Sequence, residues 1–159
     1  MIRLTSILAA FAILGTAFTW QSDAAGKNTK SDSKVKAAAT ASKIDADGKQ
    51  TVTISLNIEK GWHLYANPVN HNNDFLDANQ TTVKIATKKE KVQFKVKYPA
   101  GKTKIDKKEK YDVYEGAIKI EASVVRAKGD TSPLEITIDV SACDDKNCLA
   151  PGKIKLTEK

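Results

Sequence analysis

The sequence predicts an all-β fold, an immunoglobulin-like antiparallel β-sandwich, on three observations. Apolar residues recur at every second position in several short segments, as in Val52–Ile58 and Leu134–Val140. Turn-forming pairs such as Asp47-Gly48 and Glu115-Gly116 separate these segments. No segment of the sequence shows a sustained helical period. Period-two alternation is typical of half-buried strands, and about seven short strands at this spacing favour a sandwich of two sheets.

The first 24 residues have the three parts of a secretory signal peptide. Arg3 supplies a positive charge, residues 4–20 are mostly apolar, and Ser22 and Ala24 are small residues suited to cleavage after Ala24. An uncleaved membrane anchor is the alternative, since an apolar run of about 17 residues is at the lower limit for crossing a bilayer. From the small-residue site we expect cleavage and a periplasmic location. Because the sequence holds no second apolar run, we expect no stable membrane insertion afterwards.

Residues 25–43 differ in composition from the rest of the sequence. They are rich in Lys, Ser, Thr and Ala, with Val35 as the only large apolar residue. This composition predicts a disordered tether, followed by the folded domain at 44–159. Five lysines and one aspartate lie in 27–43, whereas 44–159 holds 20 basic and 17 acidic residues. The net charge of +7 therefore does not indicate a basic face on the domain, and we expect no nucleic-acid partner.

Each strand expected after the tether has its own apolar set. In the first, Val52 and Ile54 alternate with Thr51 and Thr53, and the same pattern continues to position 58. Apolar residues are expected to point into the core and polar residues into solvent. The further expected strands are 83–85, 92–98, 118–124, 134–140 and 154–156.

Cys143 and Cys148 are the two cysteines of the chain, and they lie between the expected strands 134–140 and 153–157. Export would place them in an oxidising compartment, and four intervening residues let the chain turn and bring the two sulfurs together. The closed loop is so short that a disulfide contributes only about 2 kcal/mol through chain entropy. Two interpretations remain open at this point: a bond that is reduced and re-formed in function, or a structural staple.

The residues around the cysteines favour different roles for the two sulfurs. Asp144 and Asp145 follow Cys143 directly, and their charges disfavour a thiolate there. Cys148 has no adjacent acidic residue, so it is the better candidate for the attacking thiolate. No metal or other cofactor is expected, because the two histidines have no regular spacing and no acidic partner.

Three motifs together resemble a known family. Gly61-Trp-His-Leu-Tyr65, Val113-Tyr-Glu-Gly116 and Cys143-Asp-Asp-Lys-Asn-Cys148-Leu-Ala-Pro151 occur in the same order, at similar separations, in the N-terminal periplasmic domain of the thiol–disulfide interchange protein DsbD. The resemblance spans about residues 44–159. It implies an immunoglobulin-like sandwich, in agreement with the strand pattern. It also implies a cysteine pair that passes reducing equivalents from a membrane-embedded thiol reductase to periplasmic thioredoxin-fold proteins.

The same resemblance assigns roles to individual residues. It implies that Cys148 forms the mixed disulfides and that His63 and Tyr65 flank the cysteine pair. Tyr114 of the middle motif and Asp144 are the further supporting residues that we expect at the site.

The sequence departs from the known family members in two ways. Those members continue into transmembrane and thioredoxin-like domains, whereas this sequence stops at Lys159, so we expect the electron donor to act in trans. They also shield the cysteines with an aromatic residue in a cap loop, where this sequence has 104–110 with Tyr111 as the nearby aromatic. The expected function is that of a thiol–disulfide oxidoreductase component. The alternative is an exported binding or adaptor module with a structural disulfide.

Overall fold

The computed structural model describes residues 29–71, 74–89, 92–106 and 109–158. Within these ranges almost all regular structure is β-strand. In chain order the elements are the 3-10 helix η1 (Ser31–Lys34), β1 (Val35–Ala41), β2 (Lys49–Ile58), β3 (His63–Tyr65), α1 (Asp74–Asn79), β4 (Thr82–Thr87), β5 (Gln93–Lys97), β6 (Lys102–Asp106), β7 (Glu109–Tyr114), β8 (Ala117–Val125), β9 (Leu134–Val140), β10 (Ala142–Cys143) and β11 (Gly152–Glu158).

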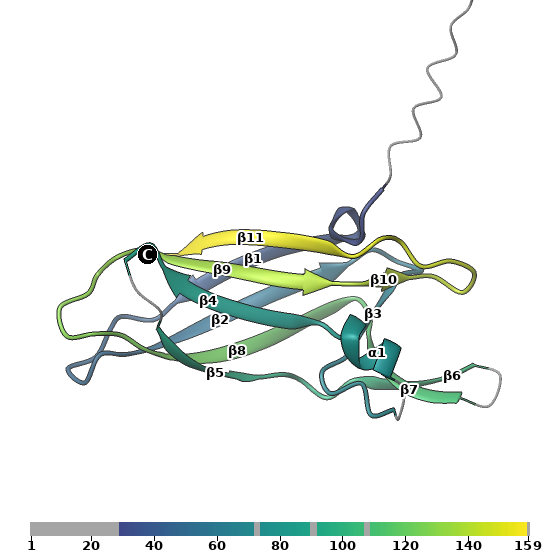
Figure 1. Cartoon of the computed structure of the whole chain (residues 1–159), viewed down its shortest axis with the longest axis horizontal. Helices are drawn as coiled ribbons and strands as arrows, with labels where there is room; N and C mark the ends of the chain where they lie inside the picture. Colours follow the sequence, from purple (N-terminus) through teal and green to yellow (C-terminus); the bar gives the residue numbers. More distant parts are fainter. Residues whose placement is uncertain (1–28, 72–73, 90–91, 107–108, 159) are drawn as a thin grey trace, which may run out of the picture.

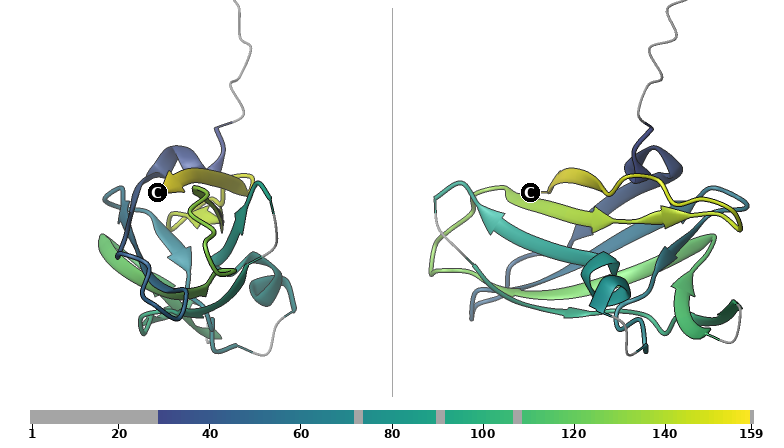
Figure 2. Two further views of the ribbon diagram at one scale, coloured as in Figure 1. Left: turned by 90° about the vertical axis from the view of Figure 1, so that its left-hand side faces the viewer. Right: turned by 45° about the vertical axis from the view of Figure 1, so that its right-hand side comes forward.

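Two antiparallel sheets pack face to face as a sandwich (Figure 1). One sheet has the strand order β1-β2-β8-β5 and the other has the order β11-β9-β4. The two views of Figure 2 show these sheets enclosing the interior of the domain. The structure therefore confirms the predicted immunoglobulin-like antiparallel β-sandwich.

Most of the core consists of apolar residues that the alternation placed inward, although Phe94 of the predicted strand 92–98 is 38% exposed. Ile54 on β2 lies opposite Ile120 on β8, and Ile85 on β4 lies opposite Ile136 on β9. All four side chains belong to one buried cluster between the sheets. Full burial of such a side chain contributes about 1.5–3 kcal/mol, so this cluster holds the two sheets together.

A third sheet, with the order β10-β3-β7-β6, lies at one end of the sandwich, and α1 lies beside it (Figure 1). Its strand β10 follows β9 after Ser141, and β3 follows β2 after a short turn. The turn before β3 requires Gly61, whose φ of +86° lies in the left-handed region that residues with a Cβ rarely adopt. This end of the sandwich brings the first and last predicted motifs together.

The N-terminal segment corrects the sequence prediction of a disordered tether over 25–43 and a domain that begins at 44. η1 and β1 are ordered parts of the domain, and β1 pairs with β2 from Val35 opposite Ile58 to Ala41 opposite Val52. Alternate alanines of β1 pack against the core. Alanine contributes little apolar surface, so the sequence shows no strand pattern here, and β1 is stabilised by its pairing with β2. Residues 25–28 and the predicted signal peptide at 1–24 lie outside the described residues.

Candidate functional site

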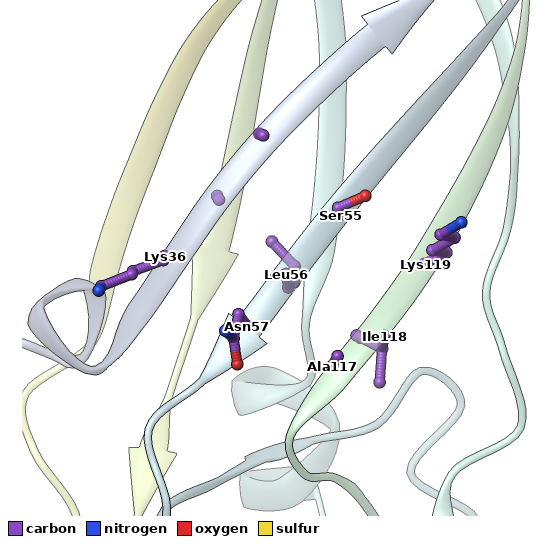
Figure 3. A pocket seen from close by; sticks show the side chains of 9 residues that line it. Lys36, Ser55, Leu56, Asn57, Ala117, Ile118 and Lys119 are labelled. Carbon is purple, nitrogen blue, oxygen red and sulfur yellow. The ribbon is translucent and has the colours of Figure 1, made fainter.

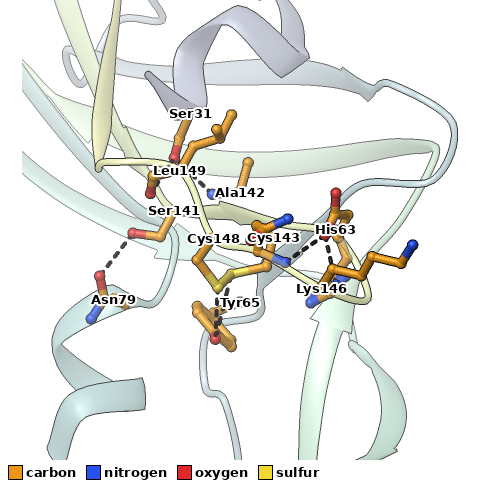
Figure 4. Close-up of a disulfide and its surroundings, with 12 residues drawn as sticks. Ser31, His63, Tyr65, Asn79, Ser141, Ala142, Cys143, Lys146, Cys148 and Leu149 are labelled. Atoms are coloured by element: carbon orange, nitrogen blue, oxygen red, sulfur yellow. Dashed lines mark hydrogen bonds between the residues drawn. A yellow bond between two sulfur atoms is a disulfide. The ribbon is translucent and has the colours of Figure 1, made fainter. Parts of the chain in front are cut away.

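Cys143 and Cys148 form a disulfide across a tight hairpin (Figure 4). Their Cα atoms are 4.0 Å apart, and the two residues lie opposite each other in antiparallel pairing. The amide of Leu149 donates to the carbonyl of Ala142, at 2.9 Å, at the base of the hairpin. The strands on either side, β9 and β11, pair with each other as the sequence predicted.

Asp144 shapes the turn between the cysteines. Its Oδ1 accepts hydrogen bonds from the backbone amides of Lys146, at 2.7 Å, and Asn147, at 2.6 Å. These two bonds hold the pKa of the Asp144 carboxyl below its usual value of 3.8. The structure thus gives Asp144 a role in the turn conformation, in addition to the charge effect that the sequence suggested.

The two sulfur-bearing residues differ in exposure. Cys143 is 2% exposed, at the end of β10, whereas Cys148 is exposed in the returning arm of the hairpin. A protein that approaches the hairpin from solvent therefore meets Cys148 first. The sequence assigned the roles of the two cysteines from neighbouring charges and from the family resemblance, whereas the burial of Cys143 is a property of the folded domain.

Strand β3 places two of the predicted supporting residues beside the disulfide. His63 lies opposite Cys143 in the β3–β10 pairing. Two positions on, and therefore on the same face of the strand, the Tyr65 hydroxyl lies 3.6 Å from Sγ of Cys143 and 3.9 Å from Sγ of Cys148. Because a disulfide sulfur carries no proton, the Tyr65 hydroxyl is the donor in these contacts (Figure 4).

A small apolar cluster surrounds the buried sulfur. Cys143 packs with Tyr65, Val69 and Leu76, and Tyr111 lies against this cluster. The ring centroids of Tyr65 and Tyr111 are 5.8 Å apart. Burial first, and Tyr111 second, raise the pKa of the Tyr65 hydroxyl, which keeps it protonated and able to donate. Tyr111, the aromatic residue next to the predicted cap-loop stretch, thus contacts Tyr65 and lies at the edge of the site.

His63 also belongs to a polar group with Lys104 and Asp145. Lys104 Nζ, from β6, lies 2.7 Å from Oδ1 of Asp145 and 3.4 Å from Nδ1 of His63. Burial and, second, Lys104 lower the pKa of His63, so that its imidazole is neutral and Nδ1 accepts from the ammonium. The hydrogen bond from Lys104 lowers the pKa of Asp145. Sequence reasoning missed this role of Lys104, because nothing local links β6 to the cysteine hairpin.

Tyr114, the remaining supporting residue of the prediction, lies elsewhere. It is 1% exposed and belongs to the main core between the sheets. Its hydroxyl accepts from the amide of Asn67, at 3.0 Å, and lies 3.1 Å from the carbonyl oxygen of Pro99. The predicted place of Tyr114 at the site is therefore corrected: its contacts anchor two connecting segments of the domain.

Two further hydroxyls hold the base of the hairpin. Ser141 donates to Oδ1 of Asn79 at the end of α1, at 3.0 Å, and Ser31 of η1 contacts Ala142 and Ala150 (Figure 4). Ser31 lies in the segment predicted as a tether, where its composition gave no signal of a structural role.

A separate groove of about 590 Å³ lies over β1, β2 and β8 (Figure 3). It is lined by exposed residues that include Lys36, Ser55 and Lys119, and Leu56, which also borders it, is only 1% exposed. Its lining holds no cysteine, histidine or carboxylate, so we place the candidate site at the cysteine hairpin.

A known protein family matches most of the chain. Residues 32–157 match the family described as "Thiol:disulfide interchange protein DsbD, N-terminal". The chain belongs to the DsbD N-terminal family. The matched range begins within η1, in agreement with the ordered N-terminal segment. No curated protein sequence matches the chain significantly.

The fold of this chain is also found in a solved structure. The N-terminal periplasmic domain of ScsB from Proteus mirabilis is 15% identical, with a TM-score of 0.59 over 80% of this chain and 48% of that one. The chain thus spans about half the length of the ScsB structure. The reduced N-terminal domain of DsbD from Neisseria meningitidis is 15% identical, with a TM-score of 0.46 over 75% of this chain and 82% of that one. The complex of the DsbD and PilB N-terminal domains from the same organism is 13% identical, with a TM-score of 0.47 over 81% and 85%.

Proposed function

We propose that this chain carries out thiol–disulfide interchange through Cys143 and Cys148. The observation that supports it most is the unequal exposure of the two cysteines within one hairpin, with Cys148 exposed and Cys143 buried. A redox pair needs one sulfur that a partner can reach and a second sulfur close enough to release that partner. Membership of the DsbD N-terminal family supports the same chemistry.

The reaction begins from the reduced pair. The Cys148 thiolate attacks one sulfur of a partner's disulfide, forming a mixed disulfide, and the electron pair of the broken bond leaves on the partner's other sulfur. The Cys143 thiolate then attacks Sγ of Cys148, which breaks the mixed disulfide and releases the partner as a dithiol. The two protons of the original thiols end on the partner, and two electrons have been transferred. Reduction by a donor dithiol runs through the same steps in reverse, and no cofactor is needed.

We assign the electron donor as a membrane-embedded thiol reductase and the recipients as periplasmic thioredoxin-fold proteins. This assignment rests on the family, and it places the chain in the periplasm after removal of residues 1–24. Across the described ranges, no helix is long and apolar enough to cross a membrane. Intact-mass measurement of the exported protein tests the location, with a mature N-terminus at Ala25 as the expected result.

The reduction potential of the cysteine pair tests the proposed function. The protein is equilibrated with glutathione buffers of known potential, and the oxidised fraction is measured by alkylation and mass spectrometry. An exchanging pair is expected to lie well above about −300 mV, whereas a structural disulfide lies below that value. A potential below about −300 mV would overturn the proposal and support the adaptor module with a permanent staple.

A further inference from the structure

A single buried hydroxyl connects the two arms of the cysteine hairpin. Ser31 is 0% exposed, and its Oγ accepts a hydrogen bond from the amide of Ala142, at 2.9 Å. The same hydroxyl donates to the carbonyl of Ala150, also at 2.9 Å. Ala142 directly precedes Cys143, and Ala150 follows Cys148 by two positions (Figure 4). Ser31 therefore bridges the chain before the first cysteine and the chain after the second.

The backbone around Ser31 fixes this bridge. The amide of Ser31 donates to the carbonyl of Ala150, at 2.9 Å, and Lys30 forms a parallel bridge with Ala150. Gly152 lets η1 lie directly on the start of β11, since a Cβ at this position would overlap the backbone nitrogen of Asp32. The N-terminal segment is thus packed onto the hairpin, 111 residues away in sequence from Ala142.

We propose that Ser31 is a positioning residue for the redox pair, which keeps the Cys143 and Cys148 thiols adjacent when the disulfide is reduced. This inference rests on the proposed function. The bridge consists of hydrogen bonds that do not involve the sulfurs, so reduction leaves them intact. A fixed hairpin raises the effective concentration of one thiol beside the other, and this favours both disulfide formation and release of a bound partner.

The effect of removing the hydroxyl depends on the redox state. In Ser31→Ala the buried amide of Ala142 loses its acceptor, which is unfavourable. When the disulfide of this variant is reduced, the hairpin opens and the Ala142 amide bonds to water. In the oxidised variant the disulfide holds the hairpin closed, and the amide stays without an acceptor. The disulfide form is therefore destabilised more than the dithiol form. We expect the equilibrium constant for disulfide formation to fall about tenfold, which raises the reduction potential by about 30 mV.

The test compares Ser31→Ala with Ser33→Ala in glutathione buffers. Ser33 is the matched control, because it lies in the same 3-10 helix and its hydroxyl donates to the carbonyl of Lys30, at 2.7 Å, away from the cysteines. The expected result is a raised potential for Ser31→Ala and an unchanged potential for Ser33→Ala. Equal potentials for the two variants, with equal losses of thermal stability in oxidised and reduced protein, would show a purely structural serine and overturn the inference.

A second measurement on the unaltered protein decides the case if Ser31→Ala does not fold. Hydrogen exchange of the Ala142 amide is followed in oxidised and in reduced protein. Protection in both states supports the bridge, and loss of protection on reduction overturns it. The proposed function fails separately, through a wild-type potential below about −300 mV, whatever the two serine variants show.

Discussion

The Tyr65 hydroxyl lies 3.6 Å from Sγ of Cys143, the buried member of the disulfide. This places a hydrogen-bond donor where a thiolate forms when the pair is reduced. Hydrogen bonds to a charged acceptor contribute about 1.5–3 kcal/mol, compared with about 0.5–1.5 kcal/mol for neutral pairs. Tyr65 therefore favours the attacking form of Cys143 in the step that releases a partner.

Replacing Tyr65 with phenylalanine tests this contact. We expect Tyr65→Phe to resolve a glutathione mixed disulfide at Cys148 about fivefold more slowly, since a loss of about 1 kcal/mol lowers the thiolate population accordingly. The rate is measured by quenching with acid and mass spectrometry. Tyr98→Phe is the control, because the Tyr98 hydroxyl accepts from the amide of Val83, in the main core. Equal rates in both variants would show that the Tyr65 hydroxyl plays no part.

The unequal exposure of the two cysteines predicts which single mutant traps a partner. Cys143→Ser leaves the exposed Cys148 to attack, and the mixed disulfide accumulates because no second thiol resolves it. Cys148→Ser leaves only a thiol that is 2% exposed in the wild-type protein, so we expect about tenfold less trapping. Non-reducing gels with an oxidised thioredoxin-fold protein, and mass spectrometry with oxidised glutathione, provide the measurement. Equal trapping would contradict the assigned roles.

The domain is expected to remain folded without its disulfide. The main core cluster lies between the sheets and does not include the cysteines, and closing so short a loop contributes about 2 kcal/mol. Cys143→Ser/Cys148→Ser should therefore melt cooperatively, with a Tm lowered by roughly 5–10 °C. Circular dichroism gives the measurement, with reduced wild-type protein as the control. A double mutant that is unfolded at room temperature would contradict this and indicate a structural bond.

Tyr114 is expected to affect stability and leave the redox chemistry unchanged. Tyr114→Phe removes the hydroxyl that accepts from the amide of Asn67, and the loss of a buried partner costs about 1–3 kcal/mol. Urea denaturation measures the stability, and glutathione equilibration measures the potential. A changed reduction potential in Tyr114→Phe would show that Tyr114 acts on the cysteine pair, as the sequence predicted.

The contact of Lys104 with His63 predicts a pH dependence. Burial and Lys104 lower the pKa of His63 below 6.5, so the unfolded chain binds the proton more readily than the folded chain. Stability from this group is complete above pH 6.5, begins to fall there, and is lost by the time the pH passes below the folded-state pKa.

Lys104→Met tests this dependence. The variant should raise the pKa of His63 towards 6.5 and that of Asp145 towards 3.8, and it should lose less stability between pH 8 and pH 5 than the wild type. NMR titration and urea denaturation at the two pH values provide the measurements. Lys146→Met is the control, since the charge of Lys146 acts on Asp144. An unchanged His63 titration in Lys104→Met would contradict the role of Lys104.

The sequence alone determined the sandwich and the hairpin. In β2 and β9 successive side chains point to opposite faces, so burial of one face requires apolar residues at alternate positions. Residues such as Ile54 and Ile136 make this pattern visible in the sequence. The hairpin was equally local, because Cys143 and Cys148 are separated by only four residues. The three family motifs also pointed to Tyr65 and His63.

Only the tertiary structure decided how the site is held and which sulfur is exposed. Strand β1 was not predicted, because its alanines bury little apolar surface and the strand is stabilised by its pairing with β2. Ser31 and Lys104 reach the hairpin across long stretches of sequence, through packing that no local pattern encodes. The burial of Cys143 arises in the same way, since Tyr65, Val69 and Leu76 lie in the stretch from β3 to α1, far from Cys143 in sequence, and pack against it only in the folded domain.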